Sequence, residues 1–148
     1  MKLCMIGTGY VGLVSGVCFS DLGNIVYCVD NDIEKINALN KGIVPIYEPG
    51  LEEILKRNYK QQRLIFTNNL KEAVENSDII FICVGTPTKK KSNSADLKYV
   101  FNVANDLKKL IKSYKILITK STVPVTTGDK IEKILIKQKR KKIVDVVS

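Results

Sequence analysis

A glycine-rich turn near the start of the chain carries the clearest chemical signal. Gly7, Gly9 and Gly12 form the pattern G-x-G-x-x-G, which follows a predicted strand and opens a predicted helix. In that setting the first glycine permits a tight turn, the second lets the backbone approach a pyrophosphate, and the third lets helix and strand pack closely. The free N–H groups near Tyr10 and Val11, with the positive end of the helix dipole, predict an anion site.

A carboxylate follows at the place that a dinucleotide-binding fold requires. Asp30 ends the second predicted strand, 18 residues after Gly12, where such folds hold the hydroxyl groups of the adenosine ribose. A carboxylate repels a 2′-phosphate and no arginine follows directly, so the sequence favours NAD over NADP. Asp32 is better placed than Asp30 to cap the next helix. Lys35, one turn into that helix, can reach the polar edge of the cofactor or simply face solvent.

Hydroxyl side chains gather in two loops that follow predicted strands. Thr86 lies in the loop Gly85–Thr88 after the fourth strand, and Thr122 lies in the loop Lys120–Pro124 after the fifth. In an open parallel sheet, ligands lie outside the carboxyl ends of the strands. Short hydrogen bonds from these hydroxyls suit a ribose or a nicotinamide amide. The alternative, that the hydroxyls only cap the following helices, fits the sequence equally well.

The composition excludes several classes of enzyme site. The 148 residues include no histidine, which removes His-based triads, His-ligated zinc and His proton shuttles. Four cysteines, Cys4, Cys18, Cys28 and Cys83, lie in apolar runs without any C-x-x-C pair, so neither a zinc knuckle nor a redox pair is indicated. We therefore expect no metal site, and four buried, reduced thiols in a cytoplasmic protein.

The charge distribution raises the alternative of nucleic-acid binding. The formal net charge is +9, and the basic excess lies beyond residue 55. However, the lysines are scattered, only Lys89–Lys91 and Lys139–Lys142 form basic runs, and no aromatic residues are interleaved for base stacking. The favoured interpretation is a solvated basic surface without a nucleic-acid partner.

An uncharged stretch from Leu3 to Ser20 resembles a signal peptide or a short membrane span in its length. It contains four glycines, and each disfavours a helix by about 1 kcal/mol relative to alanine. The glycine spacing is better explained by the phosphate turn. We therefore predict no signal peptide and no membrane segment.

Apolar runs of strand length alternate with stretches of helical period along the chain. The predicted strands are Lys2–Ile6, Asn24–Asp30, Leu64–Thr67, Asp78–Val84, Lys115–Thr119 and Ile143–Val147. The predicted helices are Tyr10–Leu22, a helix from Asp32 to near Gly42 that buries Ile33, Ile36 and Leu39, then Leu51–Arg57, Asn69–Asn76, a long helix capped by Asp96, and Thr127–Lys139.

This alternation predicts an α/β fold with a parallel sheet covered by helices on both faces. Six strands joined by right-handed crossovers fit the doubly wound, Rossmann-type order 3-2-1-4-5-6. No internal repeat and no linker rich in proline or serine divides the chain. We expect residues 1–148 to form one domain.

Several longer motifs carry a resemblance to a known family. They are GTGYVGLVSG at Gly7–Gly16, VDNDIEKI at Val29–Ile36, PIYEPGL at Pro45–Leu51, FICVGTPT at Phe81–Thr88, ADLKYV at Ala95–Val100 and KSTVPVTTG at Lys120–Gly128. This set resembles the UDP-glucose 6-dehydrogenase family, whose wider group includes GDP-mannose and UDP-N-acetylmannosamine dehydrogenases. The GTPT and KSTVPV segments are most similar to the UDP-glucose branch.

The resemblance implies a cytoplasmic, homodimeric enzyme that oxidises the C6 alcohol of UDP-glucose to the carboxylate of UDP-glucuronate with two NAD. The family's reaction passes through intermediates held on a cysteine. Its NAD contacts carry over to Gly7, Gly9, Tyr10, Val11, Gly12, Asp30, Lys35, Thr86 and Thr122. For Thr122 the resemblance adds at most a secondary role in ordering a water near the nicotinamide.

The family's catalytic glutamate, dimerisation segment and nucleophilic cysteine belong to motifs that these 148 residues do not contain. None of the four cysteines has the setting of the nucleophile. We therefore expect an NAD-binding domain without the family's central helix and carboxyl-terminal substrate domain, and without catalytic residues. Such a chain binds NAD and binds UDP-glucose only with the missing part. We also expect modest solubility or self-association, because the outer face of the sixth strand and neighbouring apolar surface are left uncovered.

Two alternatives remain open at this point. One is a related nucleotide-sugar dehydrogenase acting on GDP-mannose or UDP-N-acetylmannosamine. The other is a stand-alone NAD-sensing module, similar to the regulatory domains of potassium channels, which share the glycine pattern and the acid on the second strand. The KSTVPV and PIYEPGL segments speak against the sensor, because such loops fit a bound nicotinamide better.

Overall fold

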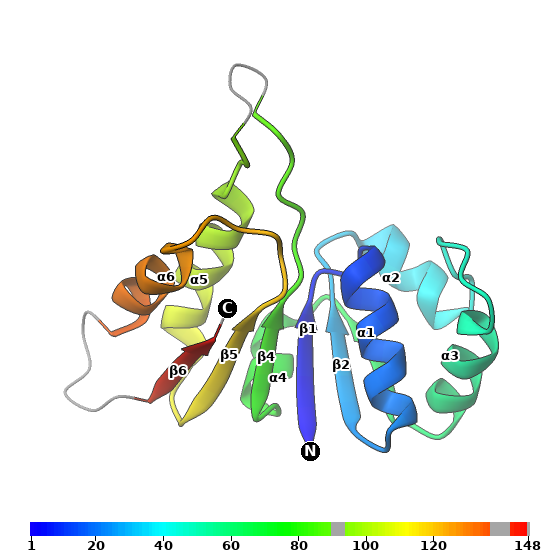
Figure 1. Cartoon of the computed structure of the whole chain (residues 1–148). Helices are drawn as coiled ribbons and strands as arrows, with labels where there is room; N and C mark the ends of the chain where they lie inside the picture. Colours follow the sequence, from blue (N-terminus) through cyan, green and yellow to red (C-terminus); the bar gives the residue numbers. More distant parts are fainter. Residues whose placement is uncertain (90–93, 137–142, 148) are drawn as a thin grey trace.

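A computed structural model describes residues 1–89, 94–136 and 143–147. Its six strands form one parallel sheet in the order β3-β2-β1-β4-β5-β6 (Figure 1), which confirms the predicted topology. The strands are β1 (Lys2–Ile6), β2 (Ile25–Val29), β3 (Leu64–Thr67), β4 (Ile79–Ile82), β5 (Lys115–Thr119) and β6 (Val144–Val147). The helices are α1 (Tyr10–Asp21), α2 (Ile33–Asn40), α3 (Leu51–Lys60), α4 (Leu70–Glu75), α5 (Lys98–Leu110) and α6 (Thr127–Ile136).

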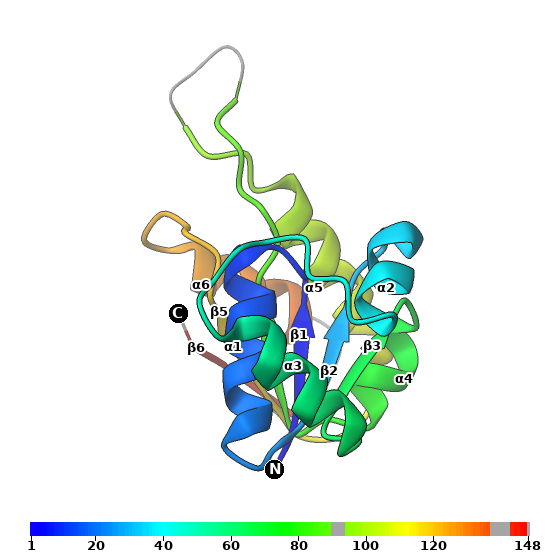
Figure 2. The ribbon, with the colours of Figure 1, turned by 90° about the vertical axis from the view of Figure 1, so that its right-hand side faces the viewer.

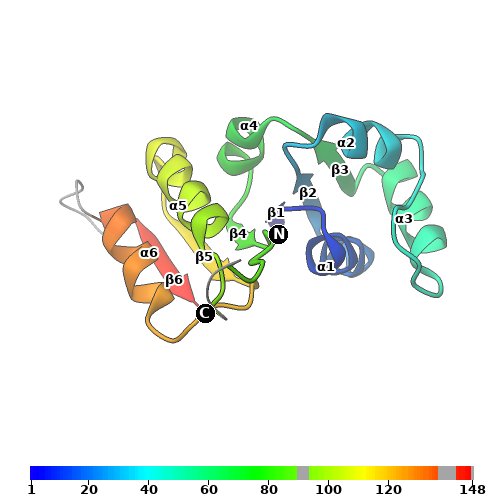
Figure 3. The ribbon, with the colours of Figure 1, turned by 90° about the horizontal axis from the view of Figure 1, so that it is seen from above.

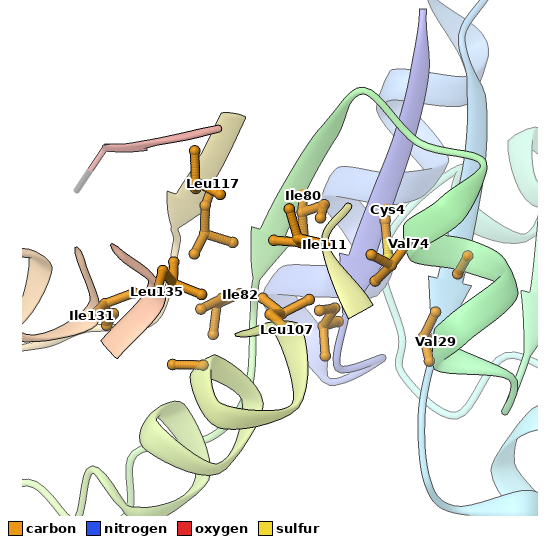
Figure 4. Packing of buried hydrophobic residues seen from close by; sticks show 14 of the residues in the cluster. Cys4, Val29, Val74, Ile80, Ile82, Leu107, Ile111, Leu117, Ile131 and Leu135 are labelled. Carbon is orange, nitrogen blue, oxygen red and sulfur yellow. The ribbon is translucent and has the colours of Figure 1, made fainter. Parts of the chain in front are cut away.

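Side chains alternate between the two faces of the sheet and form two separate apolar cores. On one face Cys4, Ile80 and Leu117 pack against buried residues of α4, α5 and α6 (Figure 4). On the other face Met5 and Phe66 pack against buried residues of α1, α2 and α3. Seen from above, α1 lies on the opposite side of the sheet from α4 and α5 (Figure 3). Because the central strands are covered on both faces, their nearly continuous apolar sequence is explained.

Helices α1 and α3 lie side by side on their face of the sheet (Figure 2). Asp21, at the end of α1, accepts hydrogen bonds from Arg57 Nη2 at 2.7 Å and Asn58 Nδ2 at 2.9 Å. These bonds, led by the one from Arg57, hold the pKa of Asp21 below its ordinary value. They belong to the last turn of α3, where Tyr59 also stacks on Phe66 at 6.1 Å between ring centroids. The predicted end of this helix at Arg57 was therefore too early.

Three further predictions need correction: the burial of Ile33, the burial of Cys18 and the start of α5. Ile33 is 56% exposed, because it starts α2 and lies beyond the part of the helix that packs on the sheet. Cys18 is exposed on α1, so only Cys4, Cys28 and Cys83 are buried thiols. Helix α5 begins at Lys98 rather than directly after Asp96. The Asp96 carboxylate still accepts from the Lys98 N–H at 3.0 Å, so the predicted cap serves from one position further away.

Three other parts of the chain can be compared with the sequence predictions: the cap of α2, the loop after β4 and the end of the last helix. Asp32 caps α2 through a hydrogen bond from the Lys35 N–H at 3.0 Å, as predicted. After β4, the segments 85–89 and 94–97 run beside each other above the sheet (Figure 1), joined by a bridge between Thr88 and Ala95. The predicted end of the last helix at Lys139 lies outside the described residues. No helix in the described part of the chain has the length and apolar character needed to span a membrane.

A lysine is buried at the amino end of β5. Lys115 is only 6% exposed, and its ammonium donates to the carbonyl oxygens of Ser77 and, at 3.4 Å, of Glu75. These carbonyls lie at the carboxyl end of α4, where the helix dipole favours a positive charge. The lysine therefore joins α4 to β5 at the end of the sheet where the strands begin, opposite the end that carries the glycine turn.

The outer strands β5 and β6 are covered more fully on one face than on the other. Helices α4, α5 and α6 each contribute buried residues to the first core. On the other face, Ile116 and Ile118 of β5 and the neighbouring Ile79 of β4 are partly exposed, and Val147 of β6 is 49% exposed. We call these four residues the open sheet face. The structure thus retains apolar surface at the place where the sequence predicts self-association, although the association itself remains a prediction.

Candidate functional site

The glycine turn between β1 and α1 is held against β4. Gly7 has φ +102°, and a Cβ there would lie 2.8 Å from the Cys83 carbonyl oxygen. Gly12, inside α1, faces the same turn and the residue that follows β4, since a Cβ there would lie 1.8 Å from the Gly7 oxygen and 3.0 Å from Cys83 Cβ. A side chain at either position would push the turn away from the sheet. The tight turn predicted at Gly7 and the close packing predicted at Gly12 are therefore both present.

The middle glycine has a different environment. Gly9 has an ordinary extended backbone, with φ −71° and ψ −172°, and no atom lies within 4 Å of the position of a Cβ. It is also the N-cap of α1 and provides no side-chain hydrogen bond, so the first N–H groups of the helix are left for another acceptor. Next to it, Tyr10 and Val11 are exposed. The space above Gly9 suits the close approach of an anionic ligand.

A cavity of about 620 Å³ opens beside this turn, at the carboxyl ends of β1, β2 and β4. This is the point where the strand order reverses, and Figure 3 looks onto that edge of the sheet. Gly7, Gly9, Asp30 and Lys35 all line it. The structure thus brings together residues from two separate predicted motifs. Tyr10, Val11 and Gly12 lie next to the cavity in sequence but are not part of its lining.

The Asp30 carboxylate, in the cavity wall, accepts four hydrogen bonds. Its Oδ2 accepts from the Thr8 N–H at 2.9 Å, the Thr8 hydroxyl at 2.7 Å and Lys35 Nζ at 3.1 Å, and its Oδ1 accepts from the Asp32 N–H at 3.1 Å. Partial burial raises the pKa of the Asp30 carboxyl, but these hydrogen bonds outweigh it, and the pKa lies below its ordinary value. The carboxylate is therefore ionised and fixed at the rim of the cavity.

Thr8 is a site residue that the sequence prediction missed. It is only 2% exposed, and both of its donors are directed to Asp30. Its signal was available in the sequence as a hydroxyl residue within the G-x-G turn, 22 residues before the acid. The motif assigns no role to the side chain between its first two glycines, so the sequence alone does not mark Thr8.

The far wall of the cavity was also missing from the prediction. It comes from Tyr99, Asn102, Val103 and Asp106 on α5, with Leu70 from the start of α4. These residues come from helices that follow other strands, and no local motif marks them. Only the tertiary arrangement places them opposite the glycine turn.

The two predicted threonines come together, but outside this cavity. The Thr86 hydroxyl donates to the Thr122 carbonyl oxygen at 3.1 Å, which joins the loops after β4 and β5. The neighbouring Ser121 hydroxyl donates to the Val84 carbonyl oxygen at 2.7 Å. Neither Thr86 nor Thr122 lines the cavity, so their contact with a cofactor remains a prediction.

Cys83 is the cysteine that lines the cavity, and it is unsuited to nucleophilic chemistry. Burial raises the pKa of its thiol to about 12, which leaves very little thiolate at neutral pH. Among the described residues, no group of three or more histidine, cysteine, aspartate or glutamate side chains is arranged to hold a metal ion. The arrangement therefore offers binding groups rather than reacting groups.

These features fit a dinucleotide such as NAD. The volume lies within the usual range of small-molecule clefts. The turn offers open space and helix N–H groups for a pyrophosphate, and the ionised Asp30 offers acceptors for ribose hydroxyls. Leu70, Val84 and Val103 add apolar walls for an aromatic base.

Comparison with known proteins gives a consistent result. Residues 1–148 match the model of the "UDP-glucose/GDP-mannose dehydrogenase family, NAD binding domain". The chain is 52% identical over 135 residues to UDP-glucose 6-dehydrogenase of Rhizobium meliloti, covering 91% of this chain and 31% of that protein. It is 49% identical over 148 residues to UDP-glucose 6-dehydrogenase TuaD of Bacillus subtilis, covering 99% and 32%. The chain thus spans about a third of the length of these relatives.

Solved structures show the same fold. A GDP-mannose dehydrogenase from Pseudomonas aeruginosa, solved as a ternary complex, matches with a TM-score of 0.91 and 37% identity, over 99% of this chain and 35% of that one. A UDP-glucose dehydrogenase from Pyrobaculum islandicum matches with a TM-score of 0.89 and 36% identity, over 97% and 34%.

Proposed function

The chain belongs to the UDP-glucose/GDP-mannose dehydrogenase family as its NAD-binding domain, and from this we propose that it serves the oxidation of UDP-glucose to UDP-glucuronate. In that reaction the C6 alcohol loses four electrons in two steps, and each step transfers one hydride to one NAD. We propose that the 148 residues hold NAD and that the sugar and the covalent chemistry need residues outside them.

The single observation that carries this proposal is the meeting of the open glycine turn with an ionised carboxylate at one cavity. Gly9 leaves room for a pyrophosphate over the first N–H groups of α1. Asp30, fixed at the end of β2, is within the same cavity and can accept from a ribose hydroxyl. When bound, NAD supplies the hydride acceptor. The residues of this chain bind it, orient it and limit its contact with water.

Individual cofactor contacts are part of the proposal. We assign the pyrophosphate to the turn from Gly7 to Gly12 and the adenosine ribose to Asp30 and Lys35. We assign Thr86 and Thr122, which join the loops after β4 and β5, to the nicotinamide side. A phosphate on the ribose would meet the Asp30 carboxylate, which favours NAD over NADP.

Isothermal titration with NAD tests the binding proposal. We expect the wild-type chain to bind and Asp30→Ala to bind at least about tenfold more weakly, since hydrogen bonds to charged groups contribute about 1.5–3 kcal/mol each. Asp129→Ala is the matched control, because Asp129 is exposed in the first turn of α6. Equal affinities of all three proteins would refute the assignment of the cavity.

The catalytic limit is tested separately by incubating the chain with UDP-glucose and NAD. We expect no sustained NADH formation, since the cavity cysteine has a strongly raised thiol pKa and the chain contains no histidine. Continuous turnover would contradict this part of the proposal while leaving NAD binding intact.

The choice of UDP-glucose within the family rests on the sequence relatives. Relatives named as UDP-glucose 6-dehydrogenases share about half of their aligned residues with this chain, and the GDP-mannose dehydrogenase of known structure shares 37%. A related nucleotide sugar is the alternative, to be decided by substrate assays on a chain that includes the substrate-binding part. A homodimeric, cytoplasmic enzyme without nucleic-acid partners completes the proposal.

A further inference from the structure

The contacts of Asp30 raise the question of which of its oxygens is available to a ligand. A carboxylate has about four acceptor positions, two on each oxygen. Oδ2 already receives three donors, from the Thr8 N–H, the Thr8 hydroxyl and the Lys35 ammonium. Oδ1 receives only the Asp32 N–H. The remaining acceptor capacity of this side chain therefore lies on Oδ1.

Thr8 is the residue that imposes this division. Its two donors come from one residue and reach the same oxygen, at 2.9 and 2.7 Å. The backbone of Thr8 is fixed in turn, because the preceding Gly7 N–H donates to the Val29 carbonyl oxygen at 2.8 Å. Thr8 is also nearly fully buried, so its hydroxyl does not exchange freely with water. The orientation of the carboxylate about its last torsion is thus set from the phosphate turn.

Lys35 completes the arrangement from the other side. Its ammonium has three donors, of which one is directed to Asp30 Oδ2 at 3.1 Å. Its side chain keeps 31% exposure and lines the cavity. A pair of neighbouring hydroxyls can therefore donate to Asp30 Oδ1 with one member and accept from Lys35 with the other.

From this geometry we propose that Thr8 is a positioning residue for the cofactor's adenosine ribose, acting by holding Asp30 so that Oδ1 faces the ribose hydroxyls. This inference rests on the proposed NAD site and goes beyond it in naming the residue that orients the carboxylate. It also links the two halves of the site, since the residue between the first two glycines of the phosphate turn sets the ribose acceptor.

The test compares Thr8→Val with Thr8→Ser, because valine keeps the shape and removes only the hydroxyl, while serine keeps the hydroxyl. The first measurement is the titration of the Asp30 carboxyl carbon by NMR without ligand. We expect the pKa of Asp30 to be higher in Thr8→Val than in the wild type and to return in Thr8→Ser. A purely structural role of Thr8 in packing would leave this pKa unchanged.

The second measurement is calorimetric titration with NAD and with inorganic pyrophosphate. We expect Thr8→Val to weaken NAD binding by about tenfold, equivalent to about 1.4 kcal/mol, with pyrophosphate binding unchanged and NAD binding restored in Thr8→Ser. Thr8→Ala, which removes the same hydroxyl without adding a branched side chain, replaces Thr8→Val if circular dichroism shows that the latter is unfolded.

The outcomes separate the two ideas. If the wild-type chain does not bind NAD, the proposed function fails, while the effect of Thr8 on the pKa of Asp30 still reports the positioning. If the wild type binds NAD and the hydroxyl-free variants match it in affinity and in the pKa of Asp30, the positioning role is refuted. Equal weakening of NAD and pyrophosphate would refute it as well, since Thr8 would then act on the phosphate turn.

Discussion

The glycine turn allows a paired test in which two alanine substitutions, three residues apart, have opposite consequences. In Gly12→Ala the new Cβ would lie 1.8 Å from the Gly7 oxygen, where ordinary contact begins at 3.4 Å. The obstacle is backbone, which cannot rotate away as a side chain can. In Gly9→Ala the new Cβ meets nothing within 4 Å, and the backbone angles suit alanine.

The expected magnitudes follow from these contacts. Overpacking of a core costs about 1–3 kcal/mol and sometimes more, so we expect Gly12→Ala to lose about 3 kcal/mol, or roughly 6–12 °C in Tm for a chain of this size. Gly9→Ala should stay within about 0.5 kcal/mol of the wild type. Its NAD affinity should fall by about 10- to 100-fold, because the methyl group displaces a pyrophosphate from charge-assisted hydrogen bonds worth about 1.5–3 kcal/mol each.

Thermal unfolding by circular dichroism and calorimetric titration with NAD measure the two effects on the same samples. A Gly12→Ala protein as stable as the wild type would refute the argument from the close packing of α1 against the turn. A Gly9→Ala protein that binds NAD as tightly as the wild type would refute the placement of the pyrophosphate above Gly9.

Four further predictions follow from other parts of the structure. The Thr119 hydroxyl is the buried side-chain group for which the described residues provide no hydrogen-bond partner. Thr119→Val should therefore stabilise the chain by about 1 kcal/mol in urea unfolding. The control Thr127→Val should destabilise it, since the Thr127 hydroxyl donates to the Pro124 carbonyl oxygen at 2.7 Å. The pKa of Asp21 is lowered first by its hydrogen bond from Arg57, so at pH 7 the urea midpoint of the wild type should exceed that of Asp21→Asn. This difference should disappear as the pH falls below about 4 and through the native pKa of Asp21. A difference in urea midpoint that is independent of pH would contradict the prediction. Ellman's reagent should react with one thiol in the native chain, the exposed Cys18, and with four in urea, whereas rapid reaction of two or more native thiols would contradict the burial of the others. Light scattering should show association that grows with concentration through the open sheet face, and a monodisperse monomer at high concentration would count against it.

The topology could be predicted from the sequence because each strand and helix is marked by a pattern of neighbouring residues. An apolar run such as that of β4 and a cap such as Asp32 depend on neighbouring residues only. The order of the strands then follows from the handedness of the crossovers. The boundary of α3 was misjudged because its last turn is stabilised by Asp21, which lies 36 residues earlier.

The site was predicted where a motif defines it and missed where only the fold does. The glycines and Asp30 have a fixed spacing that reflects one strand-turn-helix-strand unit. Asn102 and Asp106 reach the cavity from α5, and nothing in their local sequence distinguishes them from other polar residues of an amphipathic helix. Thr8 lies between these cases, because it belongs to the predicted glycine turn but its hydrogen bonds to Asp30 depend on how β1 and β2 pair.

The buried ammonium of Lys115 has a consequence for how the domain opens. If α4 or β5 moved away alone, that ammonium would lose its carbonyl partners while still enclosed, which is costly for a charged group. The end of the sheet where the strands begin, from the end of α4 to the start of β5, should therefore exchange its amide hydrogens as a single cooperative unit. At the carboxyl ends of the strands, the lysine among the described residues that line the cavity is Lys35, whose side chain is 31% exposed rather than buried. The loops there can therefore adjust to an arriving ligand while the other end of the sheet stays closed.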